Sequence, residues 1–353
     1  MSSSSVNGTG PPPVVVVGAS AGGVESLRDF VSWLPADLGV SVLVVLHVPA
    51  ASPSALPAIL RRTSNLPVRQ AQDGERLSAG EILIARPDHH LVVVDGSVLL
   101  TRGPRENGHR PAVDVLFRSA ARARGPRAMA VVLSGALDDG ASGSVAIASR
   151  GGVVAVQDFD EALYASMPRA AALAVERAEQ RTARGLAELV ASWVDSLPDD
   201  TPNDQHADRS ELEKEVDVAR MEPEAMHDLE RPGSPSGFGC PDCAGALYQI
   251  EEGNTVRYRC RVGHAWSSES LVARKTVDVE GALWVALRSL EEKAALNTEL
   301  GERAGGLGHD RTALRFAEGA KEATHAAELV RRLITEIGDA VAAHDDAGQT
   351  AIG

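Results

Sequence analysis

The chain has 353 residues and a formal net charge of -14. This length is sufficient for two or three domains, and no apolar run approaches the roughly 20 residues of a membrane-spanning helix. Residues 1–184 contain 18 Arg, no Lys and 17 acidic residues, whereas the remainder contains 17 basic and 32 acidic residues. Neither part has the basic excess that nucleic acid binding requires, and the first residues lack a signal-peptide pattern. We therefore expect a cytoplasmic protein that neither binds nucleic acid nor inserts into a membrane.

A strand, a tight turn and a helix come first in the predicted structure. Val14–Val17 are four β-branched residues in a row, which is typical of a strand buried on both faces. Residues 18–23 are only Gly, Ala and Ser, and apolar residues then recur at helical spacing over 24–34. Ser20 is thus expected at the carboxyl end of a parallel strand, where open α/β sheets hold their sites. The turn alone is compatible with a phosphate site, a nucleophile or a simple connection.

Strands and helices alternate over most of the next 150 residues. Strands are predicted over residues 42–46, 68–70, 81–85, 91–94, 97–100, 129–133 and 153–156. Helices are predicted after residues 52–53, over 111–124, after Gly140 and from Met167. Asp95-Gly96 is a hairpin signal, so a β-hairpin is expected to interrupt the alternation. The pattern predicts an α/β fold with a doubly wound, mostly parallel sheet.

Polar side chains follow three of these strands. Ser20 follows the first strand, His47 the second, and Asp138 and Asp139 the strand at 129–133. Parallel strands end at the same edge of a sheet, so these side chains are expected to lie close together. A hydroxyl becomes a nucleophile when an imidazole takes its proton and a carboxylate fixes the imidazole tautomer. A single strand-end histidine is more commonly structural, and Asp139-Gly140 is also compatible with a turn or a helix cap.

Five ordered motifs resemble the catalytic domain of the CheB-type protein-glutamate methylesterases of bacterial chemotaxis. They are the turn around Ser20, the strand ending in His47, and the runs 86–91, 110–117 and 133–140. The resemblance covers roughly residues 11–190. It implies a Ser-His-Asp triad with Ser20 as nucleophile, His47 as base and Asp139, not Asp138, as the carboxylate.

The same resemblance implies the reaction and the partner. Members of this family hydrolyse glutamate γ-methyl esters on receptors and deamidate certain glutamines, without a cofactor for catalysis. A methylated receptor or receptor-like signalling protein is therefore the expected partner. Backbone N–H groups of the Ala21–Gly22 turn and near Ala136 are expected to hold the oxyanion.

Some positions depart from the family pattern. Ala21 stands where members commonly have Thr, and Ala136-Leu137 stand where they commonly have Met-Gly. Only about 13 residues precede the first strand, so we expect no N-terminal receiver domain in this chain. Six further polar residues near the expected cleft are interpreted as surface turn residues: Arg86, Asp88, His89, His90, His109 and Arg110.

The second half is predicted to contain three further segments. Residues 191–236 are expected to be a solvated acidic linker that could contain one short helix, since 12 acidic and 3 basic residues lie between Pro198 and Glu230. Residues 237–270 contain Cys240-Pro-Asp-Cys243 and Cys260-Arg-Val-Gly-His264, a spacing typical of a zinc ribbon with structural zinc. Residues 271–345 are expected to form an α-helical hairpin.

The functional hypothesis is a serine esterase in residues 11–190, acting on glutamate methyl esters. The alternative is a non-catalytic signalling protein that binds partners through the same groove and the C-terminal extension. A nucleotide-binding protein is disfavoured because His47, not an acidic residue, ends the second strand.

Overall fold

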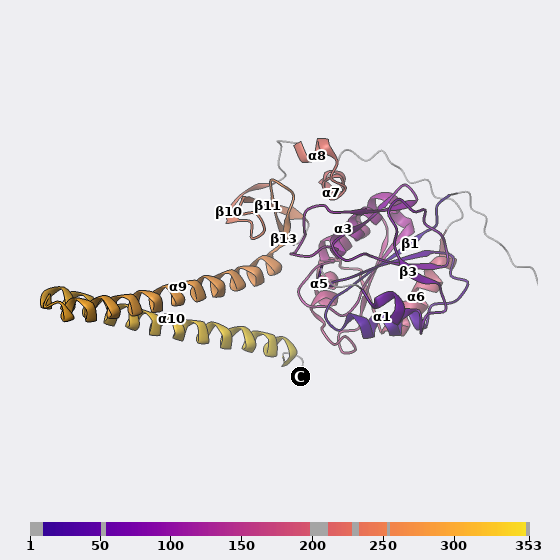
Figure 1. Ribbon diagram of the computed structural model, residues 1–353. Helices are drawn as coiled ribbons and strands as arrows, with labels where there is room; N and C mark the ends of the chain where they lie inside the picture. The colour runs from indigo at the N-terminus through magenta and orange to yellow at the C-terminus, as the bar shows by residue number, and fades with distance from the viewer. Residues whose placement is uncertain (1–9, 51–53, 198–210, 228–232, 253–254, 351–353) are drawn as a thin grey trace, which may run out of the picture. The chain divides into compact units, whose positions relative to one another are not determined.

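A computed structural model of the chain describes residues 10–50, 54–197, 211–227, 233–252 and 255–350. The chain divides into two compact units, Met1–Leu271 and Val272–Gly353. The first unit holds a large α/β body and a small antiparallel sheet, and two long helices make up most of the second (Figure 1).

Seven parallel strands form the central sheet of the first unit, in the order β3-β4-β2-β1-β7-β8-β9. Their bounds are β1 Val14–Ala19, β2 Ser41–Leu46, β3 Val68–Gln70, β4 Glu81–Ile84, β7 Ala128–Val132, β8 Val153–Gln157 and β9 Glu179–Arg181. Every residue of β1, β2 and β7 is buried, as expected for strands covered on both faces. Because β2, β1 and β7 are neighbours, their carboxyl ends lie together at the centre of one sheet edge.

Helices cover both faces of this sheet (Figure 1). One face packs against α1 (Gly23–Ser32), α2 (Leu56–Leu60) and α6 (Ala183–Ser196). The other packs against α3 (Val113–Arg124), α4 (Ala141–Ser149) and α5 (Ser166–Ala174), with the 3-10 turn η1 (Gly125–Arg127) after α3. The predicted α/β class with a doubly wound parallel sheet is confirmed. The expected helix start at residues 52–53 lies outside the described ranges.

The predicted hairpin is also present. β5 (His90–Val94) and β6 (Ser97–Thr101) pair antiparallel and turn at Asp95-Gly96, both of which have positive φ. A two-residue hairpin turn needs two consecutive residues in the left-handed backbone region, and Asp-Gly adopts this conformation readily. The prediction that His90 is a surface turn residue is wrong, because its side chain begins β5 and is fully buried.

Burial of His90 makes the stability of the fold depend on pH. Its Nε2–H donates to the Pro104 carbonyl at 2.9 Å, and the Ala112 N–H donates to Nδ1 at 3.3 Å. Burial lowers the pKa of His90 to about 4, whereas an unfolded histidine titrates near 6.5. The unfolded chain therefore binds the proton first as pH falls, and the stability contributed by neutral His90 is lost between pH 6.5 and 4.

We expect the unfolding free energy to fall by about 2 kcal/mol between pH 7 and pH 5 through this residue. Urea unfolding at the two pH values measures the change, and His90→Gln is expected to reduce the pH dependence. His89→Gln, at a partly exposed neighbouring position, should leave the dependence unchanged. If the unfolding free energy depended on pH equally in wild type and in His90→Gln, His90 would not be the source of this dependence.

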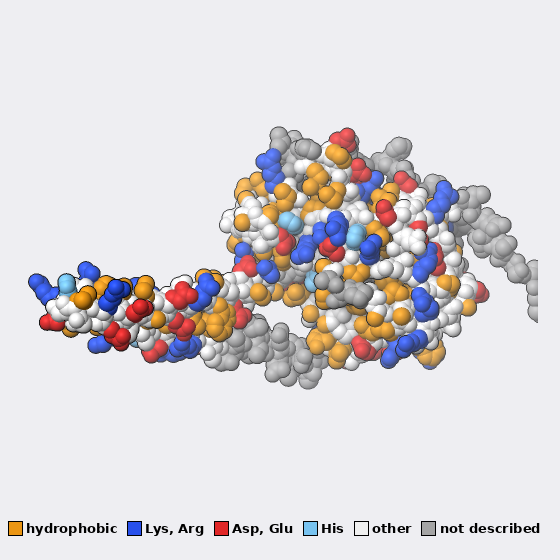
Figure 2. All heavy atoms as spheres, in the orientation of Figure 1, with side chains coloured by type: hydrophobic (Ala, Val, Ile, Leu, Met, Phe, Trp, Pro, Cys, Tyr) orange, Lys and Arg blue, Asp and Glu red, His pale blue; other side chains and the backbone are white. Residues whose placement is uncertain are grey.

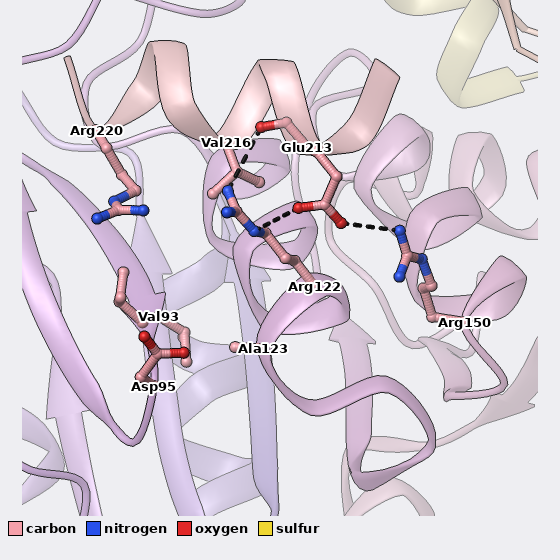
Figure 3. Close-up of a pocket in the computed structure, with 9 residues that line it drawn as sticks. Val93, Asp95, Arg122, Ala123, Arg150, Glu213, Val216 and Arg220 are labelled. Atoms are coloured by element: carbon pink, nitrogen blue, oxygen red, sulfur yellow. Dashed lines mark hydrogen bonds and ion pairs between the residues drawn. The ribbon is translucent and has the colours of Figure 1, made fainter. Parts of the chain in front are cut away.

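The acidic segment after α6 contains a packed helix, so the prediction of a solvated linker is wrong there. In α7 (Glu211–Ala219), Glu215, Val216 and Ala219 are buried against the α/β body. A cavity of about 240 Å³ is lined by residues of α7 and of the α/β body. Glu213 of α7 forms ion pairs with Arg122 and Arg150, at 2.6 and 3.0 Å. Figure 3 shows these side chains pointing toward one another. A short helix, α8 (Pro223–His227), follows. Residues 198–210 and 228–232 of the predicted linker lie outside the described ranges.

A four-stranded antiparallel sheet, which we call the ribbon, completes the first unit. It consists of β10 (Ser234–Gly239), β11 (Ala246–Glu252), β12 (Thr255–Cys260) and β13 (Ala265–Ser267). Its small core consists of Leu247, Trp266 and Leu271 with two cysteines, Cys240 and Cys260. So small a core supplies little stability without an additional cross-link such as a metal ion.

Five buried charged side chains connect the ribbon, α7 and α3. Glu215 of α7 binds Arg257 and Arg259 of β12 at 2.9 and 3.0 Å and Arg118 of α3 at 3.2 Å. Glu106 also binds Arg118, and it accepts a hydrogen bond from Arg259 at 3.1 Å. Burial alone raises the pKa of Glu106, but the Arg118 and Arg259 charges outweigh it and lower that pKa. The carboxylates therefore remain ionised within this cluster.

The second unit contains most of the predicted helical hairpin. α9 (Ser268–Gly306) and α10 (Asp310–Thr350) are joined around Gly308, which has φ 75. Arg331 of α10 binds Glu291 of α9 at 2.5 Å. Figure 2 shows acidic, basic and hydrophobic side chains mixed along the surface of these helices. Among the helices in the described ranges, none is both long and apolar enough to cross a bilayer.

Candidate active site

Ser20 stands at the junction of β1 and α1. Its N–H donates to the Ser134 carbonyl at 2.9 Å, and the Gly23 N–H donates to the Ser20 carbonyl at 2.9 Å. Gly22 has φ 68, and a Cβ at this position would approach Ser134 Oγ within 2.7 Å. The turn therefore needs glycine for both its conformation and its close packing. These constraints hold the partly exposed Ser20 at the edge of the sheet.

His47 lies between Ser20 and Asp139. Its Nδ1 is 3.1 Å from Ser20 Oγ, and its Nε2 is 2.7 Å from Asp139 Oδ2. A carboxylate can only accept, so Nε2 carries the proton and donates to Asp139, and Nδ1 is left to accept from the Ser20 hydroxyl. The three side chains, which follow β1, β2 and β7, therefore form a continuous hydrogen-bonded chain.

Four donors converge on the Asp139 carboxylate. Oδ2 accepts from His47 and from the Val113 N–H at 2.8 Å, and Oδ1 accepts from the Asp114 N–H at 3.1 Å and from Asn107 Nδ2 at 3.2 Å. The two backbone donors belong to the first turn of α3, where the helix dipole favours negative charge. Burial raises the pKa of Asp139, but the His47 hydrogen bond and the neighbouring charges hold this pKa well below its usual range. Asp139 is therefore ionised at neutral pH.

The loop before Asp139 has an unusual backbone. Leu137 has φ 59, in the left-handed region that favours glycine. A non-glycine residue in this region stores strain of about 1–3 kcal/mol. Asp138 does not bind His47 and instead accepts hydrogen bonds from Ser267 and Ser270, at 2.6 and 3.1 Å. Burial raises the pKa of Asp138 to about 6.

Two residues next to the triad were not identified from the sequence. Asn107 donates to Asp139, as described above, and the His109 ring stacks on His47 with centroids 3.7 Å apart and planes 7° apart. His109 lies in a turn, as predicted, but its ring packs against the triad instead of lying on the surface. Burial, together with the charge of His47, lowers the pKa of His109 to about 4, so its ring is neutral at pH 7.

The sequence feature that indicates the positions of Asn107 and His109 is the dipeptide Asn107-Gly108, which is typical of a tight turn. Both residues have positive φ, and Glu106 and His109 exchange backbone hydrogen bonds of 3.2 and 2.8 Å across the turn. Asn-Gly is the preferred sequence of such a two-residue turn. The turn places Asn107 and His109 beside Asp139 and His47. Asp88 and Arg110 contact each other instead, at 2.6 Å.

Cys240, Cys243, Cys260 and His264 form a cluster in the ribbon whose ligand atoms all lie within 4.8 Å of one another. Cys243 Sγ is 3.7 Å from Cys260 Sγ, and His264 Nδ1 is 3.5 Å from Cys260 Sγ and 3.8 Å from Cys240 Sγ. Tetrahedral zinc, with bonds of about 2.3 Å to sulfur and about 2.0 Å to nitrogen, places its ligand atoms roughly 3.5–3.8 Å apart. The geometry of the four side chains therefore fits a tetrahedral metal ion.

Comparison with known proteins shows similarity over the α/β body. Residues 15–190 match the model of the CheB methylesterase family. A Leptospira interrogans protein is 34% identical over 158 residues, covering 44% of this chain and 82% of that protein. A Methanosarcina mazei protein named protein-glutamate methylesterase/protein-glutamine glutaminase 2 is 37% identical, covering 44% of each chain. The chain thus spans less than half the length of some curated relatives.

The crystal structure of the Thermotoga maritima CheB methylesterase catalytic domain is also similar. It is 30% identical, with 51% of this chain and 98% of that domain covered and a TM-score of 0.49.

Proposed function

Because the chain belongs to the CheB methylesterase family, we propose that its α/β body is a serine esterase that hydrolyses glutamate γ-methyl esters on receptor or receptor-like proteins. The observation that carries this proposal is the position of His47, hydrogen-bonded to Ser20 Oγ on one side and to ionised Asp139 on the other. A protein that only binds partners has no need of this arrangement.

The reaction begins with acyl transfer to Ser20. Ser20 Oγ attacks the ester carbonyl carbon while its proton passes to His47 Nδ1, and Asp139 stabilises the imidazolium. The tetrahedral intermediate then collapses, the C–O bond to the methoxy group breaks, and His47 returns the proton so that methanol leaves. Water, deprotonated by His47, then attacks the acyl-enzyme carbonyl. The bond to Ser20 Oγ breaks, His47 returns the proton to Ser20, and the receptor keeps a free glutamate side chain. The same steps with ammonia as leaving group deamidate glutamine.

The N–H groups of Ala21 and Ala136 are assigned to the oxyanion of the tetrahedral intermediate. In the described part of the chain, neither N–H is engaged in a backbone hydrogen bond. Both belong to turns beside Ser20, at the carboxyl ends of β1 and β7. One preorganised donor of this kind contributes about 3 kcal/mol to the stabilisation of the transition state.

The ribbon cluster is assigned to structural zinc. Cys240, Cys243, Cys260 and His264 would hold the ion with four protein ligands, which leaves no open position for a substrate or water. Zinc would cross-link the β10–β11 and β12–β13 connections of a sheet whose hydrophobic core is small.

Methanol release and covalent labelling together test the esterase proposal. The full chain, mixed with methylated receptor, is expected to release methanol, and a fluorophosphonate is expected to add to Ser20 with loss of fluoride. Mass spectrometry of the digested protein identifies the labelled serine. Absence of methanol release, or labelling only at serines other than Ser20, would refute the proposal. Zinc well below one ion per chain would separately refute the metal assignment.

A further inference from the structure

The ribbon is joined to the segment that supports the triad by backbone hydrogen bonds. The Ala265 N–H donates to the Arg105 carbonyl at 3.2 Å, and the Asn107 N–H donates to the Ala265 carbonyl at 2.8 Å. The Ser267 N–H also donates to Asn107 Oδ1 at 2.8 Å. Strand β13 therefore fixes both the backbone and the side-chain amide of Asn107.

The orientation of Asn107 matters because its amide is bound at both ends. Its oxygen accepts from Ser267, so its nitrogen faces Asp139 Oδ1 at 3.2 Å. Two residues later, His109 stacks on His47. The five residues 105–109 thus contact the ribbon on one side and two members of the triad on the other.

Two further connections attach the ribbon to the same region. Ser267 and Ser270 donate to the carboxylate of Asp138, the residue before Asp139. Arg259 of β12 binds Glu106, which begins the Asn107-Gly108 turn. All of these contacts lie within the first unit of the chain. Glu106 and Asn107 are buried, and the contacts of Asp138 are partly buried.

The contacts originate next to the cysteine and histidine cluster. Cys260 follows Arg259 directly, and His264 directly precedes Ala265. The Cys260 N–H donates to the His264 carbonyl at 2.9 Å, which closes the turn between β12 and β13. Cys260 and His264 are therefore the direct chain neighbours of Arg259 and Ala265.

From this continuity we infer that the ribbon positions the catalytic triad, and that metal binding at Cys240, Cys243, Cys260 and His264 supports esterase activity from a distance. The inference rests on the proposed esterase function. Asn107 and His109 act as positioning residues through Asp139 and His47. The metal cluster in turn fixes the strand that holds them.

The expected consequence is a loss of turnover with little loss of substrate binding. A loosened β12–β13 turn releases Asn107 Oδ1, and Asp139 then loses a donor that helps to orient it. Removing a hydrogen bond that orients a metal ligand typically lowers activity by about 10- to 100-fold, and we expect an effect of similar size where Asn107 orients Asp139. We therefore expect kcat to fall by about this factor in the metal-free protein, with KM changed by less than about twofold.

The full-length variant Cys243→Ser tests the inference, with Arg261→Ala as a matched control. Cys243 is exposed, and Arg261 is an exposed residue of the β12–β13 turn. Cys243→Ser should lose zinc. Fluorophosphonate should then label its Ser20 about 10- to 100-fold more slowly than in wild type. Its kcat should fall by the same factor, with KM changed by less than about twofold. Arg261→Ala should match wild type in all three measurements. Hydrogen–deuterium exchange should increase over residues 104–110 in Cys243→Ser and stay unchanged in β1.

Zinc removal from folded wild type provides a second test that does not depend on a variant. A chelator should slow labelling of Ser20, and added zinc should restore the rate, while circular dichroism shows an intact α/β body. Wild-type labelling rates in zinc-free protein, or unchanged exchange over residues 104–110, would overturn the inference and leave the esterase proposal standing. Failure of zinc-loaded wild type to label at Ser20 would instead refute the esterase proposal and, with it, this inference.

Discussion

Replacing Ser20 with alanine is expected to lower kcat for methyl ester hydrolysis by about 10⁶-fold. Ser20 Oγ is the only side-chain oxygen that faces His47 Nδ1 among the hydrogen bonds of the described residues. Its loss removes the acyl-enzyme route, and only the oxyanion donors and substrate binding remain to accelerate attack by water. Methanol release from methylated receptor measures the effect.

Ser20→Ala is expected to fold like wild type. The backbone hydrogen bonds of residue 20, to Ser134 and from Gly23, do not involve the side chain. Ser32→Ala on the last turn of α1 is a matched control, because Ser32 Oγ donates to the Asp29 carbonyl of its own helix in an exposed hydrogen bond. Its activity should equal that of wild type. If Ser20→Ala kept more than about a hundredth of wild-type activity in folded protein, the nucleophile would have to be another group.

Replacing Asp139 with asparagine is expected to lower kcat by about 10⁴-fold. Each carboxylate oxygen faces two donors, so an amide NH₂ group meets donors in either orientation. With the NH₂ toward His47, the imidazole must carry its proton on Nδ1, where it can no longer accept from Ser20. With the NH₂ toward Asn107, the Asp114 N–H loses its acceptor, and no negative charge stabilises the imidazolium.

Asp88→Asn is the matched control for Asp139→Asn. Asp88 lies near the same sheet edge but binds Arg110 and Arg102 rather than a histidine, at 2.6 and 2.9 Å. Its replacement should leave kcat within about threefold, because these ion pairs do not contact the triad and partly exposed pairs contribute little. Steady-state methanol release and Ser20 labelling rates compare the two variants. If kcat fell by less than about tenfold in Asp139→Asn, or fell equally in Asp88→Asn, the role given to Asp139 would be contradicted.

Much of the α/β body was predictable because its signals are local. The Val14–Val17 run, the turn of small residues after it and the Asp95-Gly96 hairpin each depend on neighbours in the sequence. The strands predicted between residues 14 and 156 agree with β1–β8 to within one or two residues. β9 was missed because its three residues are too few to show a hydrophobic alternation.

The sequence by itself determined the fold class, the residues that end each central strand, and the spacing of the cysteine and histidine cluster. Only the tertiary structure decided that β1 lies between β2 and β7, that His47 stacks on His109, and that Glu215 of an acidic segment is buried among three arginines. The physical reason is the separation along the chain over which each interaction acts. Propensity, turns and hydrophobic periodicity act over a few residues. The pairing of Asn107 with Ala265 instead joins elements more than 150 positions apart, and its contact with Asp139 spans 32 positions.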